Sequence, residues 1–329
     1  HGIYKMANKE TKLKGGSFSS TTLIDYGDKK IVRKKVSLFN DREYGYVRWY
    51  SQLKKLQRFE SDLPGLFPRI LNVSCDQYNA YFDLEYLQNY KNISEILSDA
   101  SLAEYEVEKI YHAFVTGLRA IHKISYAPNP GAPLLYFKEE VEQKIDDANG
   151  YEAFFQFYNL GTYECDGRIV HGITNYFDEL RNYFTELELE SEEQIHGNPT
   201  LENTMYSFVD DKVVFIDPYE ESIIDTKFLD YAMVLQSSRS HYEIYNEGSI
   251  TYEDEMPKMK IDVVIPEPLR HFNHLFQSDL KSEDKKLVDI LEATQFIRML
   301  PFKCAAGELR HAKYFYLHAC KLLGNCFSE

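Results

Sequence analysis

The sequence predicts an α+β fold in which a small β-rich part, residues 1–88, precedes a larger and mainly helical part, residues 89–329. Short strand-like runs dominate the first part, and apolar residues at helical spacing dominate the second. The composition is 44% hydrophobic, with 26 Tyr and 21 Phe, which is ample for a packed core and far too apolar for a disordered chain. The length of 329 residues fits one large domain or two modest ones.

The first part reads as strand, strand, strand, helix, strand, strand. Gly27-Asp28 supplies a hairpin turn between the second and third strands. The helix is predicted from the apolar stripe of Tyr46, Trp49, Tyr50, Leu53 and Leu56. We expect strands at residues 12–13, 21–25, 30–37, 69–75 and 80–87, and a helix at residues 41–56.

The second part contains a series of helices interrupted by one strand pair. Ser101 and Glu104 form a capping box that opens a helix to about residue 123. Gly324 is expected as the C-cap of the last helix. We predict helical segments at residues 138–187, 225–237, 282–300 and 308–323, and a strand pair at residues 204–208 and 213–216.

Charge and composition exclude several classes of function. Asp and Glu number 52 against 37 Lys and Arg, so the formal net charge of −15 argues against binding of a nucleic-acid backbone. A run of about 18 apolar residues, as a membrane-spanning helix needs, is missing. The first residues lack the apolar stretch of a secretion signal, and five scattered cysteines favour a reducing compartment. We therefore expect a cytoplasmic protein.

The segment that carries chemistry is His196-Gly197-Asn198-Pro199-Thr200-Leu201-Glu202-Asn203, followed by Val213-Val214-Phe215-Ile216-Asp217. A polar loop that ends in an amide, then a short hairpin, then an apolar strand that ends in a carboxylate is typical of a metal–nucleotide site. Magnesium that bridges phosphates takes one or two protein oxygen ligands. Asn203 and Asp217 could supply them, because the hairpin brings the two strand ends together.

This segment resembles the catalytic and metal-binding loops of the protein-kinase-like small-molecule kinases, the aminoglycoside phosphotransferase and choline kinase group. The family pattern is His-Gly-Asp, four residues, Asn, and then a strand that ends in Ile-Asp. Leu229-Asp230-Tyr231-Ala232 also looks like that family's Asp-Tyr-Ala segment. The resemblance implies a bilobal protein-kinase-like fold, with Mg²⁺ and ATP or GTP as cofactor and phosphate donor. It implies metal ligation by Asn203 and Asp217, and a loop-shaping role for His196.

Asn198 departs from the family pattern, which has the catalytic Asp at this position. A carboxylate accepts the proton of the acceptor hydroxyl, whereas an amide cannot. Phosphoryl transfer nevertheless depends mainly on positioning and charge neutralisation. Three interpretations stay open: an engineered substitution, a natural but slow or differently assisted kinase, and a kinase fold that only binds.

The resemblance assigns the nucleotide's other partners to the first part of the chain. The loop with Gly15, Gly16, Ser17 and Ser19 lies between two strands, where a phosphate-covering loop belongs. Alternation in the third strand selects Lys34 over Arg33 and Lys35 as the phosphate-binding lysine. Glu43 is its expected ion-pair partner. The hinge, whose backbone would pair with the nucleobase, is Glu85-Tyr86-Leu87.

The leading hypothesis is a phosphotransferase that moves the γ-phosphate of ATP or GTP to the hydroxyl of a small molecule. The resemblance allows a sugar, amino alcohol, aminoglycoside or nucleoside as acceptor. An acidic run before the loop is usually a solvated face, and its functional interpretation is attraction of a cationic acceptor; the run comprises Glu186, Glu188, Glu190, Glu192 and Glu193. The alternatives are a nucleotide-binding pseudokinase or scaffold and a nucleotidyl transferase. The sequence leaves the oligomeric state open.

Overall fold

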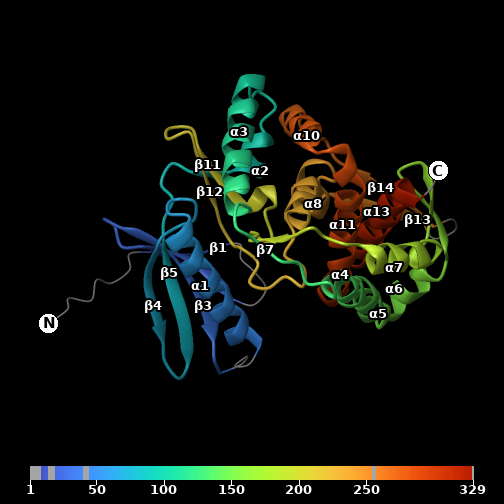
Figure 1. Cartoon of the computed structure of the whole chain (residues 1–329), viewed down its shortest axis with the longest axis horizontal. Coiled ribbons are helices and arrows are strands. Elements are labelled where there is room, and N and C mark those ends of the chain that lie inside the picture. The colour runs from blue at the N-terminus through green and yellow to red at the C-terminus, as the bar shows by residue number, and fades with distance from the viewer. Residues whose placement is uncertain (1–8, 14–18, 40–43, 254–256, 328–329) are drawn as a thin grey trace. The chain divides into compact units, whose positions relative to one another are not determined.

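The computed structural model describes residues 9–13, 19–39, 44–253 and 257–327 (Figure 1). It divides the chain into two compact units, neither of which is continuous in sequence. Unit 1 comprises His1–Glu95, His112–Ile121 and His196–Ser222, and unit 2 comprises Ile96–Tyr111, His122–Ile195 and Ile223–Glu329. Unit 1 therefore contains the predicted N-terminal lobe together with two later stretches, one of which carries the His196–Asn203 loop.

Unit 1 is built on a five-stranded antiparallel sheet with the strand order β1-β2-β3-β5-β4. Gly27 adopts a φ of +91° in the turn between the second and third strands, where the sequence predicts a hairpin. In the centre of the sheet Lys34 lies opposite Phe82. The strands are β1 (Lys9–Leu13), β2 (Ser20–Asp25), β3 (Lys30–Ser37), β4 (Ile70–Cys75) and β5 (Asn79–Glu85).

Helix α1 (Tyr44–Asp62) packs on this sheet through one apolar face. Trp49 is buried, lies 5.7 Å from the Phe82 ring, and donates its indole N–H to the Lys34 carbonyl oxygen at 3.2 Å. Leu53, Leu56 and Phe59 are also buried. The predicted stripe is thus largely confirmed, except that Tyr50 is exposed.

A second, three-stranded sheet in unit 1 has the order β12-β11-β6, with β12 (Lys212–Phe215), β11 (Thr204–Ser207) and β6 (Lys91–Asn92). Its hairpin is the predicted strand pair. Phe215 packs against Phe67 and Phe114, the latter from helix α3 (Glu104–Ile121). These contacts place the end of β12, and therefore Asp217, beside the apolar interior of unit 1.

Unit 2 is mainly helical, and its core is α11 (Lys285–Arg298) packed between α8 (Lys227–Ser238) and α13 (Leu309–Phe327). Around this core lie the shorter helices and the small strand pair of β7 (Ser125–Tyr126) and β10 (Glu192–Glu193). The other helices are α2 (Ile93–Leu97), at the junction with unit 1, α4 (Ala132–Phe137), the π-helix η1 (Lys138–Glu142), α5 (Gln143–Asn149), α6 (Glu152–Tyr158), η2 (Ile173–Asn175), α7 (Phe177–Glu186), α9 (Tyr242–Glu247), α10 (Glu267–Asp279), η4 (Ser282–Asp284) and α12 (Leu300–Ala305).

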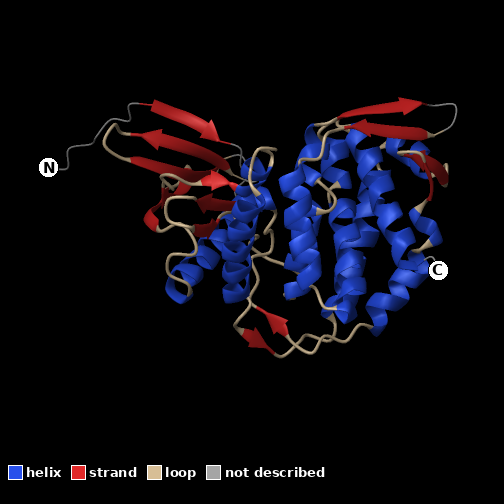
Figure 2. Cartoon of the chain, turned by 90° about the horizontal axis from the view of Figure 1, so that it is seen from above, coloured by secondary structure: helices blue, strands red, loops and turns tan. Residues whose placement is uncertain are grey.

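A four-stranded sheet in unit 2 corrects the prediction that residues 138–187 and 225 onward are helical apart from loops. Its order is β13-β14-β8-β9, and Figure 2 shows its strands beside the helices of this unit. The residues of β14 alternate between exposed and buried, which is the pattern of a half-buried strand. The strands are β8 (Thr162–Cys165), β9 (Arg168–His171), β13 (Ser249–Glu253) and β14 (Lys258–Asp262).

Two predicted helix-capping residues are also wrong. Helix α3 begins three residues after Ser101, and the Glu106 carboxylate accepts the Ala103 N–H at 3.2 Å, so only the glutamate half of a capping box is present, and it is shifted by two residues. Ser101 instead donates its hydroxyl to Asp99. Gly324 lies within α13, which runs on to Phe327 because its apolar face stays buried through Leu323.

The five cysteines are free thiols. Burial raises the pKa of Cys320 to about 12, which keeps that thiol protonated. Among the described residues, every helix is too short or too polar to cross a membrane.

Candidate nucleotide and metal site

His196 fixes the start of the loop with its imidazole ring, which is fully buried. Its Nε2–H donates to the Ile216 carbonyl oxygen at 2.8 Å, and its Nδ1 accepts the Asn198 N–H at 3.0 Å. These partners require the neutral tautomer with the proton on Nε2. The ring also stacks on Phe67 with a centroid distance of 5.9 Å. His196 therefore joins the loop to the strand that leads to Asp217.

Gly197 allows the tight course of the main chain after His196. Its φ of +89° lies in the left-handed region, and a Cβ atom here would lie 2.9 Å from the Tyr219 Cβ. The loop and the segment after Asp217 therefore lie so close together that a side chain at this position would force one of them to shift.

Asn203 closes the loop and connects it to β12. Its side-chain N–H donates to the Asn198 carbonyl oxygen at 3.1 Å, and its own carbonyl oxygen accepts the Ile216 N–H at 2.9 Å. The amide nitrogen is thus used within the loop, which leaves the amide oxygen as the atom that can ligate a metal. This main-chain hydrogen bond joins Asn203 to Ile216, the residue before Asp217, and so links the two predicted metal ligands.

Asp217 lies in the left-handed region with a φ of +50°, a conformation that Asp tolerates better than most residues. Its Oδ1 is 2.6 Å from the Lys34 Nζ, and the Lys34 side chain is almost completely buried. Neighbouring Arg33 instead pairs with Asp83 at 2.8 Å, and Lys35 is exposed. The structure therefore brings together the predicted lysine, Lys34, and the predicted carboxylate, Asp217, which are far apart in the sequence.

Helix α1 contacts the segment after Asp217 through three polar side chains that sequence reasoning missed. The Gln52 Nε2 donates to the Pro218 carbonyl oxygen at 3.1 Å, and Arg48 pairs with Glu220. The Lys55 Nζ donates to the carbonyl oxygens of His196 at 3.0 Å and Tyr219 at 2.6 Å. Their i, i+4, i+7 spacing was the available signal, because it places all three on one helix face.

Several predicted residues cannot be placed. Gly15, Gly16, Ser17 and Glu43 lie outside the described residues. Ser19 is described, and its hydroxyl is buried without a hydrogen-bond partner among the described residues. The proposed roles of these five residues remain predictions.

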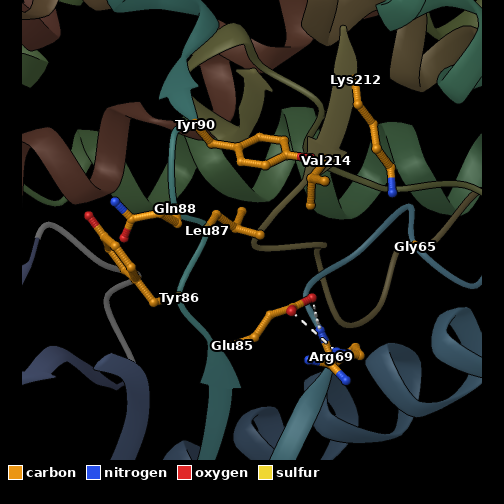
Figure 3. Close-up of a pocket in the computed structure, with 9 residues that line it drawn as sticks. All are labelled: Gly65, Arg69, Glu85, Tyr86, Leu87, Gln88, Tyr90, Lys212 and Val214. Atoms are coloured by element: carbon orange, nitrogen blue, oxygen red, sulfur yellow. Dashed lines mark hydrogen bonds and ion pairs between the residues drawn. The ribbon is translucent and has the colours of Figure 1, made fainter. Parts of the chain in front are cut away.

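The predicted hinge, Glu85-Tyr86-Leu87, borders a cavity of about 330 Å³ (Figure 3). The Glu85 carboxylate accepts the Arg69 N–H at 3.0 Å and the Arg69 Nε–H at 3.2 Å. Glu85 is three residues from Phe82, the partner of Lys34, so its side chain lies on the opposite face of the sheet from Lys34. The cavity is lined by Gly65, Arg69, Glu85, Tyr86, Leu87, Gln88, Tyr90, Lys212 and Val214.

The oxygen atoms available here suit Mg²⁺, which also binds phosphates and water, better than a metal ion that is held by protein side chains alone. Among the described residues, no three His, Cys, Asp or Glu side chains gather into a metal cluster. One carboxylate, from Asp217, and one amide oxygen, from Asn203, match the few protein ligands of a magnesium ion that also binds phosphates and water. Asp217 is the charged member, so it would supply most of the attraction for the cation.

The acidic run before the loop is only partly exposed. Glu192 and Glu193 are buried, and their carboxylates accept main-chain N–H groups of Asn129, Asp225 and Lys227. The remaining members, Glu186, Glu188 and Glu190, are exposed. Asp230, from the Leu229–Ala232 segment, is buried 2.6 Å from the His122 Nε2.

Comparison with solved structures identifies a similar fold. The chain resembles the crystal structure described as "Putative fructosamine-3-kinase" from Haemophilus somnus 129PT, with a TM-score of 0.56 and 12% sequence identity. The match covers 98% of this chain and 92% of that one. At this identity the likeness shows the fold alone: a small antiparallel sheet in the N-terminal part followed by a mainly helical part. No family model and no curated protein sequence matches the chain.

Proposed function

We propose that this protein transfers the γ-phosphate of ATP or GTP to the hydroxyl of a small molecule. The observation that carries the proposal is the 2.6 Å contact between Lys34 and Asp217, made in the unit that also holds the His196–Asn203 loop. A buried lysine on the sheet beside a carboxylate at a strand end is the pair that a phosphate-binding cation and a magnesium ligand would form before nucleotide arrives. The fold likeness to a kinase supports the same conclusion.

The residues have distinct tasks in this proposal. Bound magnesium would neutralise charge on the β- and γ-phosphates. Asp217 and Asn203 would hold it, and Lys34, released from Asp217, would bind phosphate oxygens. The acceptor oxygen forms a bond to the γ-phosphorus while the bond to the β–γ bridging oxygen breaks. Asn198 can orient the acceptor hydroxyl but cannot take its proton, so the proton passes to water or to a phosphoryl oxygen.

The acceptor is proposed to be a sugar or amino alcohol, in part because the structural neighbour bears the name of a kinase for a sugar amine. We propose a small-molecule acceptor rather than a nucleic acid or a membrane, in line with the net charge of −15.

The test is titration of the wild-type protein with ATP and GTP, with and without Mg²⁺, followed by the variants Lys34→Met and Asp217→Asn. We expect binding that strengthens with Mg²⁺, at least tenfold weaker nucleotide binding in Lys34→Met, and loss of the Mg²⁺ dependence in Asp217→Asn. Lys35→Met, which changes an exposed lysine in the same strand, is the matched control and should bind like wild type. A folded wild-type protein that binds neither nucleotide at millimolar concentration contradicts the proposal.

A second candidate, a nucleotide-binding protein without transfer activity, is favoured by one observation, the amide at Asn198. It predicts Mg²⁺–nucleotide binding but no phosphorylated product with a panel of sugars and amino alcohols, even after Asn198→Asp. Mass analysis of the products also separates an added phosphate from an added nucleotidyl group.

A further inference from the structure

The three polar side chains of α1 that contact the segment after Asp217, namely Arg48, Gln52 and Lys55, are here called the α1 tether. Their partners are Glu220, Pro218, and the pair of His196 and Tyr219. Two of the three tether residues bind main-chain carbonyl oxygens. The tether therefore restrains the main chain before Asn203, at His196, and after Asp217, at Pro218 and Tyr219.

Lys55 is the central member, because one ammonium group joins two loops. Lys55 is only 8% exposed. Its Nζ donates to the carbonyl oxygen of His196, at the start of the His196–Asn203 loop, and to that of Tyr219, two residues after Asp217. Burial of an ammonium group is costly unless its hydrogens are bonded. The bonds to these two carbonyl oxygens offset part of that cost, so the lysine favours the spacing between the two loops at which both bonds form.

Gln52 adds a second bond next to Asp217. Its residue is 4% exposed, its Nε2 donates to the Pro218 carbonyl oxygen, and its Oε1 is buried without a hydrogen-bond partner among the described residues. The donor to Pro218 fixes which way the amide points. Leaving a buried carbonyl oxygen unpaired is unfavourable, and the bond that holds Pro218, the residue after Asp217, offsets part of this cost.

The described part of α1 does not contact Lys34 through an acidic side chain. Its only acidic residues, Glu60 and Asp62, lie in the last turns beyond Lys55, and the Glu60 carboxylate accepts the Ile70 N–H. Lys34 pairs with Asp217 itself. Among the described contacts, the helix thus acts on the metal-binding segment, and the sheet lysine is held by the carboxylate that it would later release.

We propose that Lys55 is a positioning residue, which holds the main chain at His196 and Tyr219 so that Asn203 and Asp217 keep the spacing that magnesium requires. This inference rests on the proposed function for the identity of the cation. The structural part, a restraint on two loops by one buried ammonium group, can be measured without any ligand.

The experiment compares Lys55→Met with Lys54→Met, which changes the exposed neighbouring lysine on the same helix. Hydrogen exchange without ligand should be faster at residues 196–203 and 217–220 in Lys55→Met and unchanged in Lys54→Met. Nucleotide titrations should show Mg²⁺-dependent binding weakened about tenfold or more in Lys55→Met, with metal-free nucleotide binding changed by less than about threefold. A general loss of structure would weaken both kinds of binding alike.

The outcomes separate the two proposals. If wild type binds no nucleotide, the proposed function fails, and the exchange data alone decide whether Lys55 restrains the loops. If wild type binds and Lys55→Met matches it in exchange and in Mg²⁺ dependence, the positioning role is wrong. Should Lys55→Met not fold, Gln52→Met removes one neutral hydrogen bond from the same tether. It should shift both readouts in the same direction by a smaller factor, and a wild-type result there would overturn the inference.

Discussion

Asn198 offers the most direct single-residue test, because its N–H is held by His196 and its carbonyl oxygen by Asn203, so the main chain at this position is fixed whatever the side chain. Asn198→Asp should therefore supply a general base without moving the loop. We expect turnover to rise by about 10²–10⁴-fold with an acceptor that supports reaction. Steady-state release of nucleoside diphosphate measures the gain.

The control for this variant is nucleotide affinity, which should change by no more than a few-fold, since position 198 is assigned to the acceptor rather than the phosphates. Unchanged turnover in a variant that binds nucleotide normally would show that this loop does not carry the chemistry.

Gly197 tests how closely the two loops approach. Gly197→Ala places a side chain at a φ of +89° and within 2.9 Å of the Tyr219 Cβ, whereas Gly167→Ala, at +82°, meets nothing within 4 Å. The second variant carries only the backbone cost of about 1 kcal/mol. We expect Gly197→Ala to lower the free energy of unfolding by roughly 1–3 kcal/mol more than Gly167→Ala. Urea denaturation measures both, and equal losses would mean that the contact with Tyr219 relaxes freely.

The site residues divide into those that sequence could select and those that it could not. Lys34 followed from two-residue alternation in a strand, and the structure places its ammonium group beside Asp217. Lys55 was not predicted, because a lysine in an amphipathic helix normally lies at the surface. Its burial depends on carbonyl oxygens more than a hundred residues away in sequence, at His196 and Tyr219, and local patterns carry no information about such partners.

At the scale of elements, the packing of α3 on β12 depends on Gly117. A Cβ atom at this position would lie 2.8 Å from a ring carbon of Phe215 and 3.1 Å from Leu66. Gly117→Ala gains about 1 kcal/mol of helix propensity, yet we expect a net loss of about 1–2 kcal/mol in the free energy of unfolding from overpacking. Chemical denaturation gives the value.

A second substitution, Phe215→Leu, provides the internal check for Gly117→Ala. It removes the ring that the new methyl group would meet, so the two changes together should cost less than the sum of their separate effects. If the losses of unfolding free energy were strictly additive, the overpacking caused by Gly117→Ala would not involve the Phe215 ring.

Elements were predicted well where their signal is local. Strand β3, with the run Ile31 to Val36, and the hairpin of β11 and β12 combine β-branched residues with a turn, and both are found where expected. Strands β8, β9, β13 and β14 were missed. Met259 and Ile261 alternate with exposed lysines, but the run is short, and β14 pairs in parallel with distant β8. Such a strand is stabilised by non-local pairing, which propensity does not reveal.

At the scale of the whole molecule, two histidines in unit 2, the buried His318 and the half-buried His241, make the stability depend on pH. Burial lowers the pKa of His318 well below its ordinary value and that of His241 to about 4, with Arg270 assisting at His241. The unfolded chain binds these protons near pH 6.5, whereas the folded chain does not. The stabilising contribution is thus complete above about pH 6.5 and is lost as the pH falls towards 4.

His241→Asn isolates one of these contributions, and Asn tolerates the φ of +53° at this position. Between pH 6.5 and 5 the variant should lose about 1–2 kcal/mol less unfolding free energy than wild type. Denaturant titrations at several pH values measure the difference. Burial of Glu292 raises the pKa of its carboxyl group, which acts in the opposite direction but is common to both proteins. Parallel pH profiles would contradict the assignment.

The interleaved order of the two units has a consequence for how the protein is made. The chain leaves unit 1 after Ile121 and comes back to it only at His196. On the ribosome, the sheet and α1 emerge long before the carbonyl oxygens that accept the Lys55 ammonium group and the carboxylate that pairs with Lys34. Until residue 222 has left the exit tunnel, both buried cations lack these partners. The N-terminal sheet and α1 therefore acquire these contacts only late in synthesis, and a nascent chain that stops before His196 lacks the partners of Lys34 and Lys55 described above.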